Sequence, residues 1–149
     1  MVTDSVAGFL LDTNVVSEAM RPRPARDVMR WLETQPEHLL YISVITLGEI
    51  RKGVELLDEG AAKRTALQRW LDGLRLRFAD RALMFDMPVS ERWGYLSAFT
   101  SRHGLTAPVV DLQLAATALH HGLTFVTRNT ADVEPTGVPV FNPWGNAGR

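Results

Sequence analysis

The chain has 149 residues, 46% of them hydrophobic, which suits a single domain over 1–149 that buries a core without disulfide bonds. It contains no cysteine, which excludes a disulfide framework or a thiolate metal site and fits a cytoplasmic protein, and we find no secretory signal and no apolar run long enough for a membrane helix. The net charge of -1 excludes a protein that binds nucleic acid by phosphate neutralisation alone.

Strand patterns and helix patterns alternate along the chain. In order, the sequence predicts a strand at 9–11, helices at 15–20 and 25–32, a strand at 39–43, helices at 45–57 and 61–77, a strand at 83–85, a helix from Pro88 that ends before Gly104, a helix at 109–120, and strands at 124–127 and 138–141. Such alternation is typical of a parallel sheet covered by helices. The sequence therefore predicts the α/β class, with no repeat and no linker.

Four acidic residues fall at one edge of this predicted sheet. Asp12 ends the first strand, and Asp132 follows the strand at 124–127 by a few residues. Glu49 and Asp111 lie in the first turns of helices whose beginnings face the same edge. Because ligands of open α/β sheets bind at the carboxyl ends of the strands, we expect the four carboxylates to converge there.

Clustered carboxylates repel one another and raise each other's pKa, so a cation is expected among them. The chain offers no cysteine, and its histidines do not stand beside these acids in the sequence. Oxygen ligands alone favour a hard ion, Mg²⁺ or Mn²⁺. Such an ion lowers the pKa of a bound water and neutralises charge on a phosphodiester, so phosphodiester hydrolysis is the expected chemistry.

Each acid also has a purely structural interpretation. Asp12 could cap the helix that follows it, and Glu49 could be the acid of a capping box that begins at Thr46. Asp111 could be a first-turn acid that the helix dipole favours, and Asp132 could be a turn residue. The shared edge of the sheet is what favours the metal site over four separate explanations.

Four motifs cover nearly the whole chain, from Phe9 to Trp144. They are LLDTNVVSE at 10–18, ISVITLGEIRKG at 42–53, DLQLAATA at 111–118, and VTRNTAD at 126–132 with GVPVFNPW at 137–144. In this order and spacing they resemble the PIN-domain toxins of type II toxin–antitoxin systems, of the VapC family and its FitB-like branch. The resemblance implies a PIN-like fold with a central, mostly parallel sheet of four or five strands and helices on both faces.

The resemblance also implies a function. It indicates an endoribonuclease that depends on Mg²⁺ or Mn²⁺, with RNA as substrate, a cognate antitoxin as partner and a homodimer as the assembly. By this likeness Asp12, Glu49 and Asp111 are the core metal ligands, and Asp132 completes the acidic pocket as a further catalytic and metal-binding residue. One difference from the family is Val133, which stands where phenylalanine often follows the last acid.

Further polar and apolar residues are candidates for supporting roles. Thr127 and Asn129 match polar family positions beside the acids and would hold the ligands in place. Arg128 lies between them and has equal claim to be a phosphate contact or a solvated surface residue. The apolar faces at 44–57 and 61–74 are candidates to receive an antitoxin helix.

Other functions remain open at this point. A non-catalytic binding module could keep the fold without using the metal, although all four acids are present. An aspartyl-phosphate enzyme or receiver domain also places an acid at the end of its first strand, but it needs a lysine after a late strand, and this chain has only Lys52 and Lys63. A DNA-acting nuclease of the same fold is expected to have a longer chain with more acids.

Overall fold

The computed structural model describes residues 7–145, and its centre is a parallel five-stranded sheet in the order β3-β2-β1-β4-β5. The strands are β1 (Phe9–Leu11), β2 (Leu40–Ser43), β3 (Ala82–Leu83), β4 (Thr124–Val126) and β5 (Val140–Phe141). Every adjacent pair is parallel, with Phe9 opposite Leu40 on one side of β1 and Thr124 on the other. The predicted α/β class and parallel sheet are confirmed.

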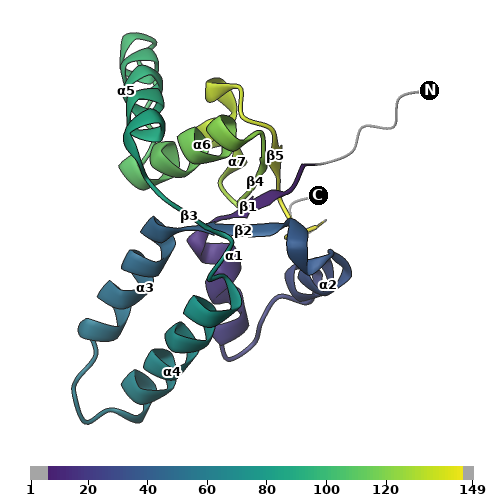
Figure 1. Cartoon of the computed structure of the whole chain (residues 1–149), viewed down its shortest axis with the longest axis vertical. Coiled ribbons are helices and arrows are strands. Elements are labelled where there is room, and N and C mark those ends of the chain that lie inside the picture. The colour runs from purple at the N-terminus through teal and green to yellow at the C-terminus, as the bar shows by residue number, and fades with distance from the viewer. Residues whose placement is uncertain (1–6, 146–149) are drawn as a thin grey trace.

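Seven α-helices and three short 3-10 turns surround the sheet in the described part of the chain. The helices are α1 (Thr13–Ser17), α2 (Arg26–Thr34), α3 (Val44–Glu55), α4 (Ala62–Arg77), α5 (Met87–Arg102), α6 (Val109–His121) and α7 (Thr130–Val133), and the 3-10 turns are Glu18–Met20, Glu37–Leu39 and Glu134–Thr136. Figure 1 shows α5, α6 and α7 on one side of the sheet and α1 to α4 on the other. Helices on both faces were predicted and are present.

Two hydrophobic cores lie on the two faces because successive side chains of a strand point in opposite directions. Leu10 is fully buried among residues of α6 and α7 such as Leu114 and Val133. Its neighbour Leu11 is buried on the other face with residues of α1 and α2 such as Val16 and Val28. A strand buried on both faces reads as a continuous apolar run, which is the pattern of Phe9–Leu11.

The observed elements differ from the predicted ones mainly in the short helices α1 and α7. The helix predicted at 15–20 begins earlier, at Thr13, and continues after Ser17 as a 3-10 turn. Helix α7 was missed, because four residues make little more than one turn and show no hydrophobic periodicity. None of the helices between residues 7 and 145 is both long enough and apolar enough to span a membrane.

Candidate active site

Asp12 stands where β1 ends and α1 begins. Its backbone N–H donates to the Val126 carbonyl at 2.9 Å, which extends the pairing of β1 with β4 by one residue. Its side chain is buried, at 4% exposure, and its Oδ2 accepts a hydrogen bond of 2.7 Å from the Thr127 hydroxyl. Asp12 occupies the N-cap position, but its carboxylate makes no capping hydrogen bond. The capping interpretation therefore does not explain this acid.

Burial is the main influence on the Asp12 carboxyl and raises its pKa above the usual value. The Thr127 hydrogen bond opposes this, as do the nearby backbone amides of Thr13 and Asn14, which lower the pKa. The carboxylate of Glu49 raises it again. Asp12 is thus held in a site where a negative charge is costly and a second negative charge is close.

Thr127 follows β4 and reaches Asp12 because β4 is the direct neighbour of β1. Its N–H donates to the Phe141 carbonyl at 3.0 Å, and its hydroxyl oxygen accepts the Asn129 N–H at 3.2 Å while donating to Asp12. The Thr127 side chain is therefore fixed from both directions. Asn129 contributes its backbone, and its exposed side chain makes no hydrogen bond to the described residues.

Glu49 lies in the second turn of α3, and two threonines position it. The Thr13 hydroxyl donates to Glu49 Oε1 at 2.5 Å, and the Thr13 and Thr46 hydroxyl oxygens are 2.9 Å apart. The capping-box interpretation is wrong, because α3 begins at Val44 and its cap is Ser43, whose hydroxyl accepts the Ile45 N–H at 3.0 Å. Sequence reasoning missed Thr13 and Thr46, although both lie inside the two motifs that carry Asp12 and Glu49.

Asp111 is half-buried in the first turn of α6, and it is the most perturbed acid of the group. Its pKa is raised to about 6, first by burial and then by the carboxylates of Asp12, Asp132 and Glu49 in that order. Its Oδ2 atom is buried without a hydrogen-bond partner among the described residues. A buried, unpartnered carboxylate oxygen facing like charges is an arrangement that a bound cation would stabilise.

Asp132 comes from α7, which follows β4 after Thr127 and Asn129. Its backbone N–H donates to the Asn129 carbonyl at 3.3 Å, so the tight turn at 129–132 sets its place. Its charge acts on Asp111, which places it within electrostatic reach of the group. The four predicted acids thus come from the residue after β1 and from α3, α6 and α7, and the other three carboxylates all act on Asp111.

The donor set fits a hard divalent ion, because all four groups are carboxylates and one oxygen of Asp111 is buried without a partner. As the side chains stand, no three acidic or histidine side chains within residues 7–145 are arranged to hold an ion directly. A bound cation would offset the repulsion between the carboxylates and so allow them to approach one another.

A polar cavity of about 190 Å³ lies between α1, the 3-10 turn that follows it, and the residues after β4 and β5. Asn14, Arg21 and Arg128 contribute to its lining, together with the buried Glu18 and the ring of Trp144. The Arg128 guanidinium lies 5.1 Å from the centre of the Trp144 ring, which is a cation–π distance. Asn14 lies two residues after Asp12 and Arg128 directly follows Thr127, so two residues of this lining are close in the sequence to residues of the acidic group.

Comparison with known proteins identifies relatives along most of the chain. The model of the PIN-domain family matches residues 9–132. The chain is 40% identical to toxin FitB of Neisseria gonorrhoeae over 136 residues, which are 91% of this chain and 98% of FitB. It is 38% identical to VapC ribonuclease Y4jK of Sinorhizobium fredii over 137 residues, 91% of this chain and 97% of that protein. The crystal structure of FitAcB from Neisseria gonorrhoeae matches with a TM-score of 0.86 and 40% identity, covering 92% of this chain and 99% of the other.

Proposed function

Since the chain belongs to the PIN-domain family, we propose that it is the toxin of a type II toxin–antitoxin system and hydrolyses phosphodiester bonds in cytoplasmic RNA with Mg²⁺ or Mn²⁺. The observation that carries the proposal is Asp111, whose buried oxygen lacks a partner and whose pKa is raised to about 6 beside three other carboxylates. Relatives at 38–40% identity that are named a toxin and a ribonuclease support it. PIN-domain ribonucleases depend on divalent metals, which agrees with this donor set.

The residues of the chain divide into ligands and positioning groups. Asp12, Glu49 and Asp111 would hold the ion, and Asp132 would complete the acidic pocket. The ion, when bound, supplies water activation and charge neutralisation at the phosphodiester. The hydrogen bond from Thr127 keeps one oxygen of Asp12 oriented and leaves the other free for ligation.

The Thr13 hydroxyl does the same for Glu49, because it binds Oε1 and leaves Oε2 free. Arg128 directly follows Thr127 in the sequence, and its guanidinium, which lines the polar cavity, would bind a backbone phosphate of the RNA. The acids would hold the cation at the cleaved bond, and Arg128 would bind a neighbouring phosphate. An extended RNA strand could make both contacts at once. Such a division would allow a chain with a net charge of -1 to bind RNA.

A cognate antitoxin is part of the proposal, as for other toxins of this class. A groove of about 370 Å³ lies between α2 and α4, and of the two candidate faces, 44–57 and 61–74, it is the second that lines it, through Trp70 and Leu74. Its lining includes the apolar residues Leu11, Val16, Met29, Trp70 and Leu74. An amphipathic antitoxin helix would fit there, and since Leu11 precedes Asp12, its end would lie close to the acids.

The test is cleavage of total RNA by the purified protein with Mn²⁺, with Mg²⁺ and with EDTA. Asp12→Asn and Asp111→Asn are expected to abolish cutting, whereas Asp58→Asn makes the same chemical change at an exposed acid and should leave it intact. Circular dichroism checks that each variant is folded. Cutting that persists in folded Asp12→Asn and Asp111→Asn protein would overturn the assignment of these ligands. Absence of cutting by any form, with no metal-induced rise in melting temperature, would favour the non-catalytic binding module.

A further inference from the structure

Four exposed arginines lie close together in the sequence, between α1 and the middle of α2. They are Arg21, Arg23, Arg26 and Arg30. The only acids in the stretch from residue 18 to residue 30 are Glu18, which is buried, and Asp27. This stretch is therefore positively charged, although the whole chain has a net charge of -1.

Most arginines of α3, α4 and the turn after α4 already have a carboxylate partner. The ion pairs are Arg51–Glu55, Arg64–Glu55, Arg75–Asp72, Arg77–Glu37 and Arg81–Glu37. By contrast, Arg23, Arg26 and Arg30 form no ion pair and no side-chain hydrogen bond within residues 7–145. Arg21 lies 3.9 Å from Glu18, which is too long for a hydrogen bond. These guanidinium groups are thus available to a ligand.

The stability of α2 does not explain the arginines at its start. Arg26 is the first residue of this helix, and Arg23 lies three residues before it. The N-terminal end of a helix carries a partial positive charge, so a cation there is unfavourable and an anion is favourable. Arg26 and Arg30 are four residues apart, so their side chains are neighbours on the helix surface and repel each other. A bound anion would offset both effects.

The start of α2 lies at the same edge of the sheet as the acids. Because α2 leads from β1 to its parallel neighbour β2, it begins near the carboxyl ends of the strands and ends near their amino ends. A Cβ atom built on Gly145 would collide with the carboxylate of Asp27, so the chain after β5 touches the first turn of α2. The Arg128 guanidinium lies over the ring of Trp144, the residue before Gly145, and it lines the same cavity as Arg21. Arg128 and the arginines of the 21–30 stretch therefore lie along one edge of the molecule.

We propose that these arginines form a basic surface that binds the phosphate backbone of single-stranded RNA on one side of the cleaved bond. The basic surface consists of Arg21, Arg23, Arg26, Arg30 and Arg128. The inference rests on the proposed function, because it takes the RNA of that function as the ligand. Guanidinium groups bind phosphates with two parallel hydrogen bonds. Trp144 is buried and residues 14–30 contain no aromatic side chain that could stack on a base, so the surface should bind RNA of any sequence.

The salt dependence of RNA binding tests the basic surface. Fluorescence anisotropy of a labelled single-stranded RNA of mixed sequence measures binding by the full chain in EDTA, so that cleavage does not interfere. The triple variant R23Q/R26Q/R30Q should bind about 100-fold more weakly than the unchanged protein at roughly 0.1 M salt. Its plot of log Kd against log salt should be less steep by about 2, because each phosphate contact with a single strand contributes about 0.7 to the slope. Unchanged affinity and slope in the folded triple variant would overturn the proposal.

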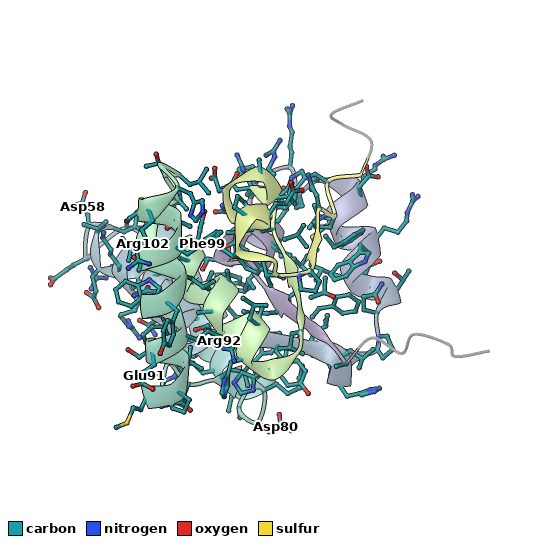
Figure 2. The ribbon with its side chains drawn as sticks, turned by 90° about the horizontal axis from the view of Figure 1, so that it is seen from above. Asp58, Asp80, Glu91, Arg92, Phe99 and Arg102 are labelled. Atoms are coloured by element: carbon teal, nitrogen blue, oxygen red, sulfur yellow. The ribbon has the colours of Figure 1, made fainter. Side chains whose placement is uncertain are left out.

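Three other exposed arginines provide the matched control, R69Q/R92Q/R102Q. Like those of α2, they form no ion pair within residues 7–145. Figure 2 shows Arg92 and Arg102 on α5, and Figure 1 shows α5 far from α2. The control variant loses the same charge, so it should keep the affinity and most of the slope of the unchanged protein. Equal losses in the two triple variants would mean that net charge alone decides binding, and the proposal would be wrong.

Cleavage of total RNA with Mn²⁺ separates this inference from the proposed function. If the unchanged protein cuts RNA and R23Q/R26Q/R30Q binds RNA as tightly as it does, the proposed function stands and only the basic surface is wrong. If the unchanged protein neither cuts RNA with Mn²⁺ nor binds it in EDTA, the proposed function fails and this inference fails with it. An acidic segment of a protein is the alternative ligand. Polyglutamate that binds more tightly than RNA, and is lost in the same triple variant, would overturn the assignment of this surface to RNA.

Discussion

Asp111 is the residue whose ionisation most destabilises the metal-free protein. Its carboxyl group has a folded-state pKa of about 6, against 3.8 for the free side chain. The folded protein therefore binds this proton more tightly than the unfolded chain does. Its contribution to stability is full below pH 3.8 and is lost as the pH rises through about 6. At neutral pH the ionised group destabilises the metal-free fold.

We therefore expect Asp111→Asn to stabilise the metal-free protein at pH 7. The gain should be about 1 kcal/mol, which is less than the full pKa shift would give because solvent screens a half-buried group. Melting temperatures in EDTA between pH 4 and pH 7.5 measure this. The melting temperature of Asp111→Asn should fall less steeply with rising pH than that of the unchanged protein. The melting temperature of Asp58→Asn should show the same pH dependence as that of the unchanged protein. If the melting temperatures of Asp111→Asn and the unchanged protein change with pH in the same way, ionisation of Asp111 does not destabilise the metal-free protein.

Substitutions of Thr127 test whether its hydroxyl positions the Asp12 carboxylate. Thr127→Val removes the 2.7 Å hydrogen bond to Asp12 but keeps the volume and the branched shape. We expect metal affinity or RNA cleavage to fall about 10- to 100-fold, because Asp12 loses both its orientation and a group that lowers its pKa. Thr127→Ser keeps the hydroxyl and should retain most of the activity. Equal activity of the valine and serine variants would mean that the hydroxyl is not used.

At the scale of elements, the start of α3 fixes where Glu49 stands. Ser43 is fully buried, ends β2 and caps α3 by accepting the Ile45 N–H. The helix therefore begins at Val44, and Glu49 faces Thr13 across the gap between α3 and α1. A one-residue change in the start of α3 would turn Glu49 away by about 100°, given 3.6 residues per turn.

Ser43→Ala should destabilise the protein by about 1 kcal/mol, because the first turn of α3 loses its cap. Urea unfolding followed by circular dichroism measures the change. Ser101→Ala is the control at an exposed serine in α5, where a change within about 0.5 kcal/mol is expected. If the two variants are equally stable, the cap does not contribute to the fold.

At the scale of the whole molecule, the four acids lie at one edge of the sheet although they are far apart in the sequence. A cation that binds them only in the folded state should therefore stabilise the whole fold. At a concentration 100 times its dissociation constant, Mn²⁺ or Mg²⁺ should add about 2.7 kcal/mol, which is roughly 5–10 °C in melting temperature for a chain of this size. Asp12→Asn and Asp111→Asn should lose this shift, and KCl at equal ionic strength should not produce it. A melting temperature that neither metal changes would count against the metal site.

The sequence by itself determined the alternation of strands and helices and the edge on which the acids lie. These follow from local rules: an apolar run such as Phe9–Leu11 is buried, and Asp12 comes next on the chain whatever the rest of the fold does. Glu49 was placed by the same reasoning, since a helix that follows a strand begins at the strand's carboxyl end, and Asp111 was placed because its helix leads into the strand at 124–127 and so begins at that same edge. The two cores of the sheet also follow from alternating side chains in β1.

Only the tertiary structure decided which side chains touch. The Thr127–Asp12 bond joins residues 115 positions apart, and the Thr13–Glu49 bond joins residues 36 positions apart. No local pattern encodes such pairs, because they depend on β1 lying next to β4 and on α1 lying next to α3. The unpartnered oxygen of Asp111 likewise depends on the packing of several elements and not on a local pattern. Whether a group is buried, paired or left exposed depends on all the elements around it, and only the packed molecule sets that environment.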